Sequence, residues 1–138
     1  MDYEVETVTV DGGATALGSA GPFTLVVDRP VGAGGRGLGF DGGQLLNLAV
    51  AACLSNDLFR EAARTGLALR RVRVAVASDY AGEPAVSGPI DYDVELNGDA
   101  PEADLLALLQ AVDRIAEIPN SLRRGTDVRL RHASVKGR

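Results

Sequence analysis

Residues 41–55 read Asp-Gly-Gly-Gln-Leu-Leu-Asn-Leu-Ala-Val-Ala-Ala-Cys-Leu-Ser, a helix start followed by a long apolar run. Asp41 is a favourable N-cap residue, and Gln44 three positions later completes a capping box. From Leu45 to Leu54, every position except Asn47 is apolar. A helix that is apolar nearly all round is normally buried. The sequence therefore predicts that a helix begins at Asp41 and lies at the centre of the fold.

Regular structure is predicted on both sides of this helix. It is expected to end at Thr65-Gly66, and a second helix is expected to start near Pro101 and end at Pro119. Alternating β-branched, aromatic and polar residues predict strands. The predicted strands are residues 3–10, 14–20, 23–28, 72–76, 90–96 and 128–135. This order, βββ-α-ββ-α-β, predicts an α+β fold with antiparallel sheets in a single domain, residues 1–138.

Glycine is concentrated just before the central helix. Of the 17 glycines, seven lie between Gly32 and Gly43, where Gly32-Ala33-Gly34-Gly35-Arg36-Gly37 fits the G-x-G-x-x-G pattern. In a dinucleotide site these glycines lead directly into the helix, whose N-terminus meets the pyrophosphate. Here the helix begins only at Asp41, and an acid at the expected distance is missing. The run is therefore interpreted as a connector that delivers the chain to the helix.

Composition excludes several classes of function. Fourteen basic and 19 acidic residues give a net charge of −5, which does not favour nucleic acid or an anionic membrane as partner. The six Lys and Arg residues between Arg123 and Arg138 are interpreted as the solvated face of a strand. The N-terminal residues resemble no export signal, and the apolar runs are too short for a membrane span. A cytoplasmic protein is expected.

Few residues are candidates for catalysis or metal binding. With one histidine, His132, and one cysteine, Cys53, neither a Cys/His metal site nor a Cys-His nucleophile pair is expected, and no cofactor motif is present. Cys53 lies about three turns into the helix, too far from its N-terminus to be activated by the helix dipole. Asp57, one turn later, would disfavour a thiolate if it lay close. These residues alone favour a buried structural cysteine, unless an arginine from elsewhere reaches the thiol.

The segment from Gly34 to Asp57 is similar to the OsmC/Ohr family of osmotically inducible and organic-hydroperoxide-resistance proteins. The glycine run, Asp41-Gly42-Gly43-Gln44-Leu45-Leu46 and Ala51-Ala52-Cys53-Leu54-Ser55 carry the resemblance. It implies an intertwined homodimer in which two central helices pack inside antiparallel sheets shared by the subunits. It also implies reduction of organic hydroperoxides, a peroxiredoxin activity in oxidative-stress defence, with Cys53 as the peroxidatic cysteine.

The chain departs from that family at three functional positions. Gly43 stands where the family carries a glutamate, Ile118 stands where a resolving cysteine precedes Pro119, and no Lys or Arg precedes Arg29. Arg36, in the glycine run, is the cationic partner that the sequence offers instead. Without a second cysteine, a sulfenic acid on Cys53 would need an external thiol reductant.

Two hypotheses about function follow. In the first, the protein is a one-cysteine, thiol-dependent hydroperoxide reductase that acts through Cys53, with Arg36 beside it. In the second, it is a catalytically inactive OsmC-like homodimer that serves as a scaffold or binds a small apolar ligand. That ligand is expected in a pocket at the dimer interface, lined by the apolar helix around Ala49 to Leu54.

Overall fold

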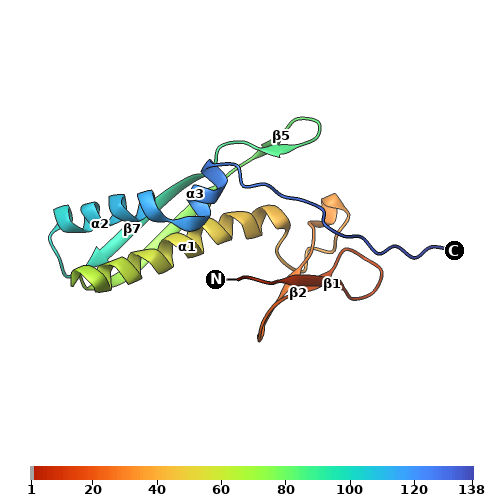
Figure 1. Cartoon of the computed structure of the whole chain (residues 1–138), viewed down its shortest axis with the longest axis horizontal. Helices are drawn as coiled ribbons and strands as arrows, with labels where there is room; N and C mark the ends of the chain where they lie inside the picture. The colour runs from red at the N-terminus through yellow and green to blue at the C-terminus, as the bar shows by residue number, and fades with distance from the viewer. Residues whose placement is uncertain (1) are drawn as a thin grey trace. The chain divides into compact units, whose positions relative to one another are not determined.

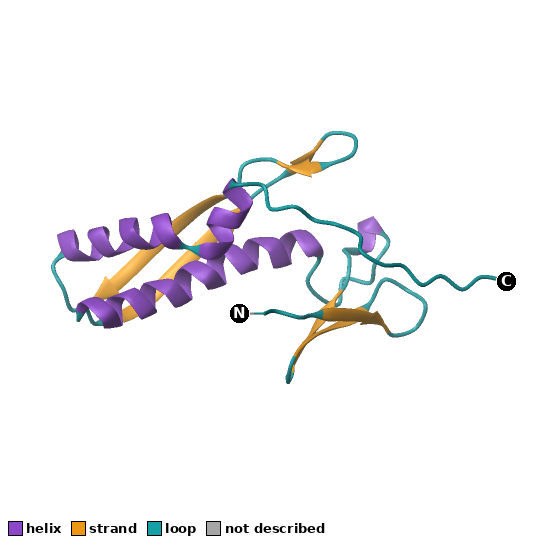
Figure 2. Ribbon diagram, viewed as in Figure 1, coloured by secondary structure: helices purple, strands orange, loops and turns teal. Residues whose placement is uncertain are grey.

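The computed structural model describes residues 2–138 and confirms an α+β fold with antiparallel sheets (Figures 1 and 2). The helical elements are η1 (Val31–Ala33), α1 (Gly42–Thr65), α2 (Glu102–Ile115) and α3 (Glu117–Arg123). The strands before α1 are β1 (Glu6–Thr9), β2 (Ala16–Ala20) and β3 (Phe23–Val27). Those after α1 are β4 (Leu69–Ala77), β5 (Tyr80–Ala81), β6 (Val86–Ser87) and β7 (Asp91–Gly98).

The strands form three small sheets. β1, β2 and β3 make an antiparallel meander in that order, with Thr7 opposite Gly18 and Leu17 opposite Val26. β4 pairs with β7, while β5 and β6 form a short hairpin in the link between them. Along β7, exposed and half-buried residues alternate at every position, as the sequence predicted.

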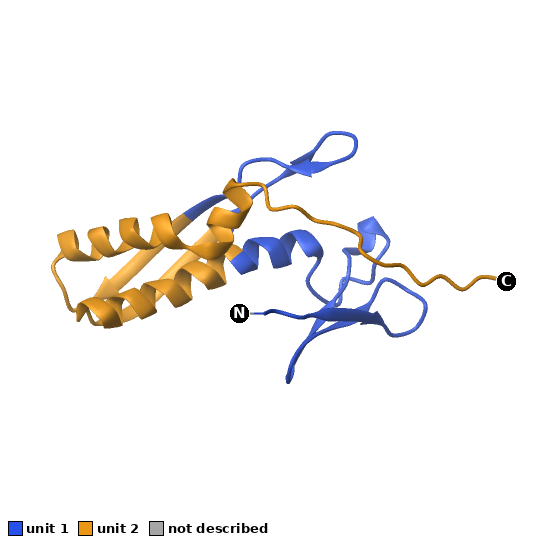
Figure 3. Ribbon diagram, viewed as in Figure 1, with its two compact units in different colours: residues 1–49, 76–92 blue, residues 50–75, 93–138 orange. Residues whose placement is uncertain are grey.

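The chain divides into two compact units (Figure 3). The first unit comprises the described residues up to Ala49 together with Val76–Tyr92; the second comprises Val50–Ala75 and Asp93–Arg138. α1, β4 and β7 each contribute residues to both units. The single domain over residues 1–138 stays a prediction.

The two units differ in how much apolar surface they bury. The second unit has a core contributed by α1, α2 and the turn into α3: Val50, Leu54, Leu58, Ala62, Leu108, Val112 and Ala116. Among the described residues of the first unit, only Thr15, Ala16 and Asp28 are buried. The first unit therefore rests on hydrogen bonds far more than on an apolar core.

Both ends of α1 follow the signals in the sequence. The Gln44 N–H donates to Asp41 Oδ1 (2.8 Å), and the Asp41 N–H donates to Gln44 Oε1 (3.0 Å). This reciprocal pair is the predicted capping box, which satisfies N–H groups that have no partner inside the helix. At the other end, Gly66 has a φ of +73°, the left-handed conformation that commonly ends helices at glycine.

The glycine-rich connector is held by one buried carboxylate, that of Asp28. It accepts hydrogen bonds from the Thr15 hydroxyl (3.1 Å) and from the backbone N–H groups of Arg29 (2.7 Å), Leu38 (3.2 Å) and Arg36 (3.3 Å). Burial raises the pKa of Asp28, but these hydrogen bonds outweigh burial and hold the pKa below its ordinary value. The Asp28 carboxylate thus holds the connector in place between residues 29 and 38.

Two glycines of the connector are required by close backbone approach. A Cβ atom on Gly35 would collide with the carbonyl oxygen of Arg29, and one on Gly39 would collide with that of Val26. The connector then bridges to β3, since the N–H of Phe40 donates to the Val26 carbonyl (3.1 Å). The local excess of glycine is therefore explained by packing of the connector against the end of β3.

The predicted last strand, 128–135, is wrong for the single chain. Residues 126–138 contain no helix or strand, and Val128, Leu130 and Val135 are almost fully exposed. Alternation of side chains shows that a segment is compatible with a sheet, but a strand also needs a neighbouring edge to accept and donate its backbone hydrogen bonds. Among residues 2–138, no strand pairs with this segment.

The predicted end of the second helix at Pro119 is also wrong. α2 ends at Ile115, and Ala116, with ψ of 120°, separates it from α3. Pro119 is the third residue of α3. In the first turn of a helix, a residue without an N–H loses no intrahelical hydrogen bond, so proline is accepted there.

The expectation that α1 is buried nearly all round holds only for one face. Val50, Leu54 and Leu58 are buried, whereas Leu48, Ala49 and Ala52 are exposed. An amphipathic helix was not predicted here because the exposed residues are as apolar as the buried ones. The single chain therefore leaves an apolar face of α1 open.

Replacing Asp28 with Asn should destabilise the first unit. The amide retains one acceptor oxygen and turns two donor hydrogens toward backbone N–H groups, so Tm is expected to fall by roughly 5 °C or more. Because the pKa of Asp28 is depressed in the fold, its stabilisation is complete above about pH 4 and is lost as pH falls below that value. Thermal unfolding from pH 2.5 to 7 measures both effects.

The matched control is Asp11→Asn, which removes an exposed ion pair with Arg36. It should change Tm by less than about 2 °C. An equal loss of stability in both variants would contradict the role assigned to Asp28.

Candidate functional site

The single cysteine lies in the middle of α1, in the second unit. Cys53 is half-buried, and its thiol donates a hydrogen bond to Asp57 Oδ2, with Sγ and oxygen 3.9 Å apart. The two residues are one helical turn apart, which places their side chains on the same face. Asp57 therefore lies close to the thiol.

Asp57 is itself part of a buried-to-surface charge network. Its side chain is 9% exposed, and Oδ1 lies 2.9 Å from an Nη atom of Arg60. Arg60 also lies 3.1 Å from a carboxylate oxygen of Glu61, which in turn pairs with Arg64 (3.2 Å). The hydrogen bond from Arg60 lowers the pKa of Glu61, and the hydrogen bond to Glu61 together with the charge of Asp57 raises the pKa of Arg60.

Arg36, the predicted cationic partner of Cys53, is anchored in the first unit. Its backbone N–H binds Asp28, and its guanidinium lies 2.6 Å from Asp11 in the turn after β1. The side chain is half exposed at this point. The structure thus explains where Arg36 is held, and its action on Cys53 stays a prediction.

Gly43 and Ile118 occupy the two positions at which the family pattern has a glutamate and a cysteine. A Cβ atom on Gly43 would lie 3.4 Å from the Cε2 atom of Tyr80, in ordinary contact. Gly43 lines a cavity of about 710 Å³ together with Asn47, whose amide oxygen accepts a hydrogen bond from Ser78 (3.0 Å). The position of the family's glutamate therefore lies in the wall of this cavity, where Gly43 provides no carboxylate.

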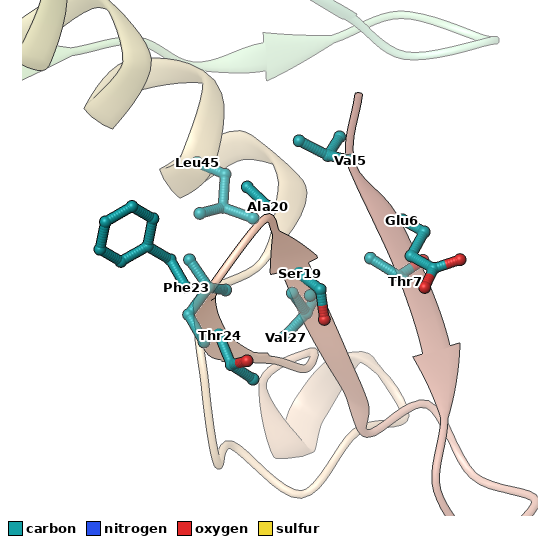
Figure 4. A pocket seen from close by; sticks show the side chains of 11 residues that line it. Val5, Glu6, Thr7, Ser19, Ala20, Phe23, Thr24, Val27 and Leu45 are labelled. Carbon is teal, nitrogen blue, oxygen red and sulfur yellow. The ribbon is translucent and has the colours of Figure 1, made fainter. Parts of the chain in front are cut away.

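An apolar cavity of about 250 Å³ lies in the first unit, on the β1–β2–β3 sheet beside the first turn of α1 (Figure 4). Its apolar lining comes mainly from Val5, Phe23, Leu25, Val27 and Leu45. This pocket lies at the start of α1. It is a different site from the interface pocket predicted along Ala49 to Leu54, which stays a prediction.

The remaining candidate, His132, lies in the C-terminal segment that has no regular structure and is exposed. Within residues 2–138, no group of three metal-ligating side chains is present. Over the same residues, no helix combines the length and apolar character needed to cross a bilayer.

Along the chain, the long helix that carries the cysteine lies between two groups of strands. This element order agrees with the result of a sequence comparison. The model of the family described as OsmC-like protein matches residues 34–131. The chain belongs to the OsmC-like protein family. No curated protein sequence matches it significantly.

Solved structures of OsmC-like proteins share the fold. The OsmC-like protein from Mycoplasma pneumoniae has a TM-score of 0.78 at 16% identity, covering 89% of this chain and 88% of that one. A putative organic hydroperoxide resistance protein from Vibrio cholerae, with captopril bound in one of its active sites, has a TM-score of 0.62 at 20% identity (89% and 85% covered). The organic hydroperoxide resistance protein OhrB of Bacillus subtilis has a TM-score of 0.62 at 17% identity (89% and 91%).

For an OsmC-like protein, the charge arrangement next to Cys53 includes one residue that sequence reasoning missed. Arg60 follows Cys53 by seven positions and Asp57 by three, spacings that place all three on one helix face. That spacing is the signal in the sequence that could have identified Arg60.

Proposed function

We propose that this OsmC-like protein is a one-cysteine, thiol-dependent organic hydroperoxide reductase of the cytoplasm, with Cys53 as its nucleophile. The observation that carries the proposal is the half-buried thiol of the only cysteine, in contact with a buried carboxylate that pairs with a half-exposed arginine on the central helix. Family membership and the named hydroperoxide resistance proteins that share the fold support the choice of substrate class.

The reaction uses the thiol and an external reductant. Sulfur attacks the terminal oxygen of the hydroperoxide, so an S–O bond forms, the O–O bond breaks and the substrate leaves as an alcohol. Cys53 is oxidised by two electrons to a sulfenic acid. Since no second cysteine exists, an external thiol condenses with the sulfenic acid and releases water. A second external thiol then restores Cys53 and leaves as the disulfide.

Arg36 is proposed as the cation that binds the peroxide group during attack. An arginine offers several N–H donors to oxygen atoms that gain negative charge as the O–O bond breaks. To act, its guanidinium exchanges Asp11 for the substrate, a change that is inexpensive because the ion pair is exposed.

The central test is peroxide consumption with cumene hydroperoxide and a dithiol reductant. The wild-type protein should consume peroxide, and Cys53→Ser should fall to the rate measured without protein, because a hydroxyl is a far weaker nucleophile than a thiol. Ser55→Ala, a small change two residues away on the same helix, is the matched control and should keep the wild-type rate. Equal rates for wild type and Cys53→Ser would refute the reductase.

Arg36→Gln should lower kcat/KM for the hydroperoxide by about tenfold or more, while Tm changes by less than about 2 °C. The loss reflects one missing charged donor at the reacting oxygens. The control Asp11→Asn removes the partner of Arg36 but not the guanidinium, so its kcat/KM should not fall. Unchanged kinetics in Arg36→Gln would exclude this residue from the site.

A second candidate function is binding of a small apolar molecule without catalysis. The cavity of about 250 Å³ beside Phe23 and Leu45 favours it, because its lining is almost entirely apolar. Saturable binding of cumyl alcohol, without peroxide consumption by wild-type protein, would favour this function over the reductase.

We also propose that the protein works as a homodimer. Among residues 2–138, twenty-two large apolar side chains are exposed in the single chain, including Leu48 on α1 and Phe23 at the start of β3. So much exposed apolar surface marks an interaction face. The open face of α1 includes part of the apolar run Leu45 to Leu54, and it is a surface that a second copy would cover.

Light scattering should therefore give twice the 14.3 kDa chain mass. Leu48→Asp places a charge on the open face of α1 and should shift the population to monomer or unfolded chain, because a buried charge without a partner is strongly destabilising. Gln110→Asp, on an exposed position of α2, is the control and should leave the dimer intact. A stable folded wild-type monomer would contradict the proposal.

A further inference from the structure

The carboxylate of Asp57 makes two different contacts, one through each oxygen. Oδ2 accepts the hydrogen bond from the Cys53 thiol (3.9 Å), and Oδ1 forms an ion pair with Arg60 (2.9 Å). All three residues belong to α1. The helix backbone therefore fixes their spacing, and no loop has to close to bring the carboxylate to the thiol.

Burial makes this arrangement specific. The Asp57 side chain is 9% exposed, while Arg60 is 51% exposed and extends toward solvent. Leu54 and Leu58, on either side of Asp57 along the helix, are fully buried. The carboxylate is thus held at the edge of the core, where an ionised group is retained only with a partner such as Arg60.

Other charged groups around the pair lie on α1 and α3. Glu61 binds Arg60, Arg64 binds Glu61, and Glu117 at the start of α3 acts on Arg60 through its charge. The residues of α2 that are buried, Leu108 and Val112, are apolar. Among these groups, Asp57 is the carboxylate whose oxygen contacts Sγ.

We propose that Asp57 is a catalytic residue that accepts the proton of Cys53 as sulfur attacks, and that Arg60 is the positioning residue that holds its carboxylate. The peroxide step rests on the proposed reductase function, whereas the proton transfer itself applies to attack on any electrophile. This helix-borne pair supplies a carboxylate and a cation beside the thiol in a chain that has Gly43 at the family's glutamate position.

The proton balance is complete within the site and the substrate. The S–H bond breaks as S–O forms, and the proton moves to Asp57 Oδ2. The O–O bond breaks, and the departing alkoxide takes the proton from Asp57 and leaves as the alcohol. The carboxylate returns to its ionised form paired with Arg60, and the terminal peroxide oxygen keeps its own hydrogen in the sulfenic acid.

The experiment measures alkylation of Cys53 by iodoacetamide between pH 5.5 and 7.0. A carboxylate is already ionised throughout this range, so the rate for wild-type protein should change less than about threefold. In Asp57→Asn only the thiolate reacts, and its rate should rise about tenfold per pH unit below the ordinary thiol pKa, or about 30-fold over the range. Asp104→Asn, at an exposed position of α2, should retain the wild-type profile.

A wild-type rate that rises tenfold per unit would overturn the proposal without any variant. So would profiles that are the same in wild-type protein and in a folded Asp57→Asn. Should Asp57→Asn not fold, Arg60→Gln carries the test. Without Arg60 to hold it, the Asp57 carboxylate should accept the thiol proton less efficiently, so the alkylation rate at pH 6 should fall about threefold or more. The rate at pH 9, where the thiolate dominates, should change little. An unchanged rate at pH 6 would overturn the role of Arg60.

Hydroperoxide consumption separates this inference from the reductase function. If the alkylation rate of Cys53 is nearly independent of pH only when Asp57 is present, and no peroxide is consumed, the reductase function is refuted and Asp57 remains the proton acceptor. Peroxide consumption that depends on Cys53, with equal pH profiles in wild type and Asp57→Asn, supports the reductase and refutes the role of Asp57.

Discussion

The buried carboxylate of Asp28 is the interaction on which the arrangement before α1 depends. It gathers one hydroxyl and three backbone N–H groups, and so folds a glycine-rich connector that has little side-chain surface of its own to bury. Glycine makes the connector possible by allowing backbone to approach backbone at Gly35 and Gly39, but it costs conformational entropy. A carboxylate that accepts several hydrogen bonds offsets that cost where an apolar core is absent. The connector then delivers Asp41 to cap the helix that carries Cys53.

Local signals in the sequence predicted both ends of α1 correctly, but they did not predict the structure of the C-terminal segment. Asp41, Gln44 and Gly66 act through contacts within a few residues, so their identity and spacing predicted both helix ends correctly. The segment 128–135 has an equally regular pattern, yet it forms no strand in the single chain. The difference is physical: a helix satisfies its backbone internally, whereas a strand depends on another segment. Pro119 shows the same limit, because its effect depends on its position within a helix that begins at Glu117.

The candidate site divides in a similar way. Cys53 and the neighbouring Asp57 were predictable, because a single cysteine is conspicuous and helical spacing brings the fourth residue onward onto the same face. Arg60 was not singled out, since an arginine on an amphipathic turn is normally just a solvated charge. Its significance appears only with the burial of Asp57, which the sequence could not specify. Arg36 lies at the opposite extreme: the sequence singled it out, and the structure shows Asp11 as its partner.

The apolar character of α1 connects these observations. A helix apolar nearly all round and a single chain that buries only one of its faces are inconsistent unless something covers the other face. The first unit has a similar deficit: among its described residues only Thr15, Ala16 and Asp28 are buried, and most of the large apolar side chains of its β1–β2–β3 sheet are exposed. In the proposed homodimer, a second copy would cover the open face of α1 and the exposed apolar strands of the first unit. Residues 128–135 fit that proposal, since a segment with strand character needs a neighbouring strand edge, and a partner chain would supply one.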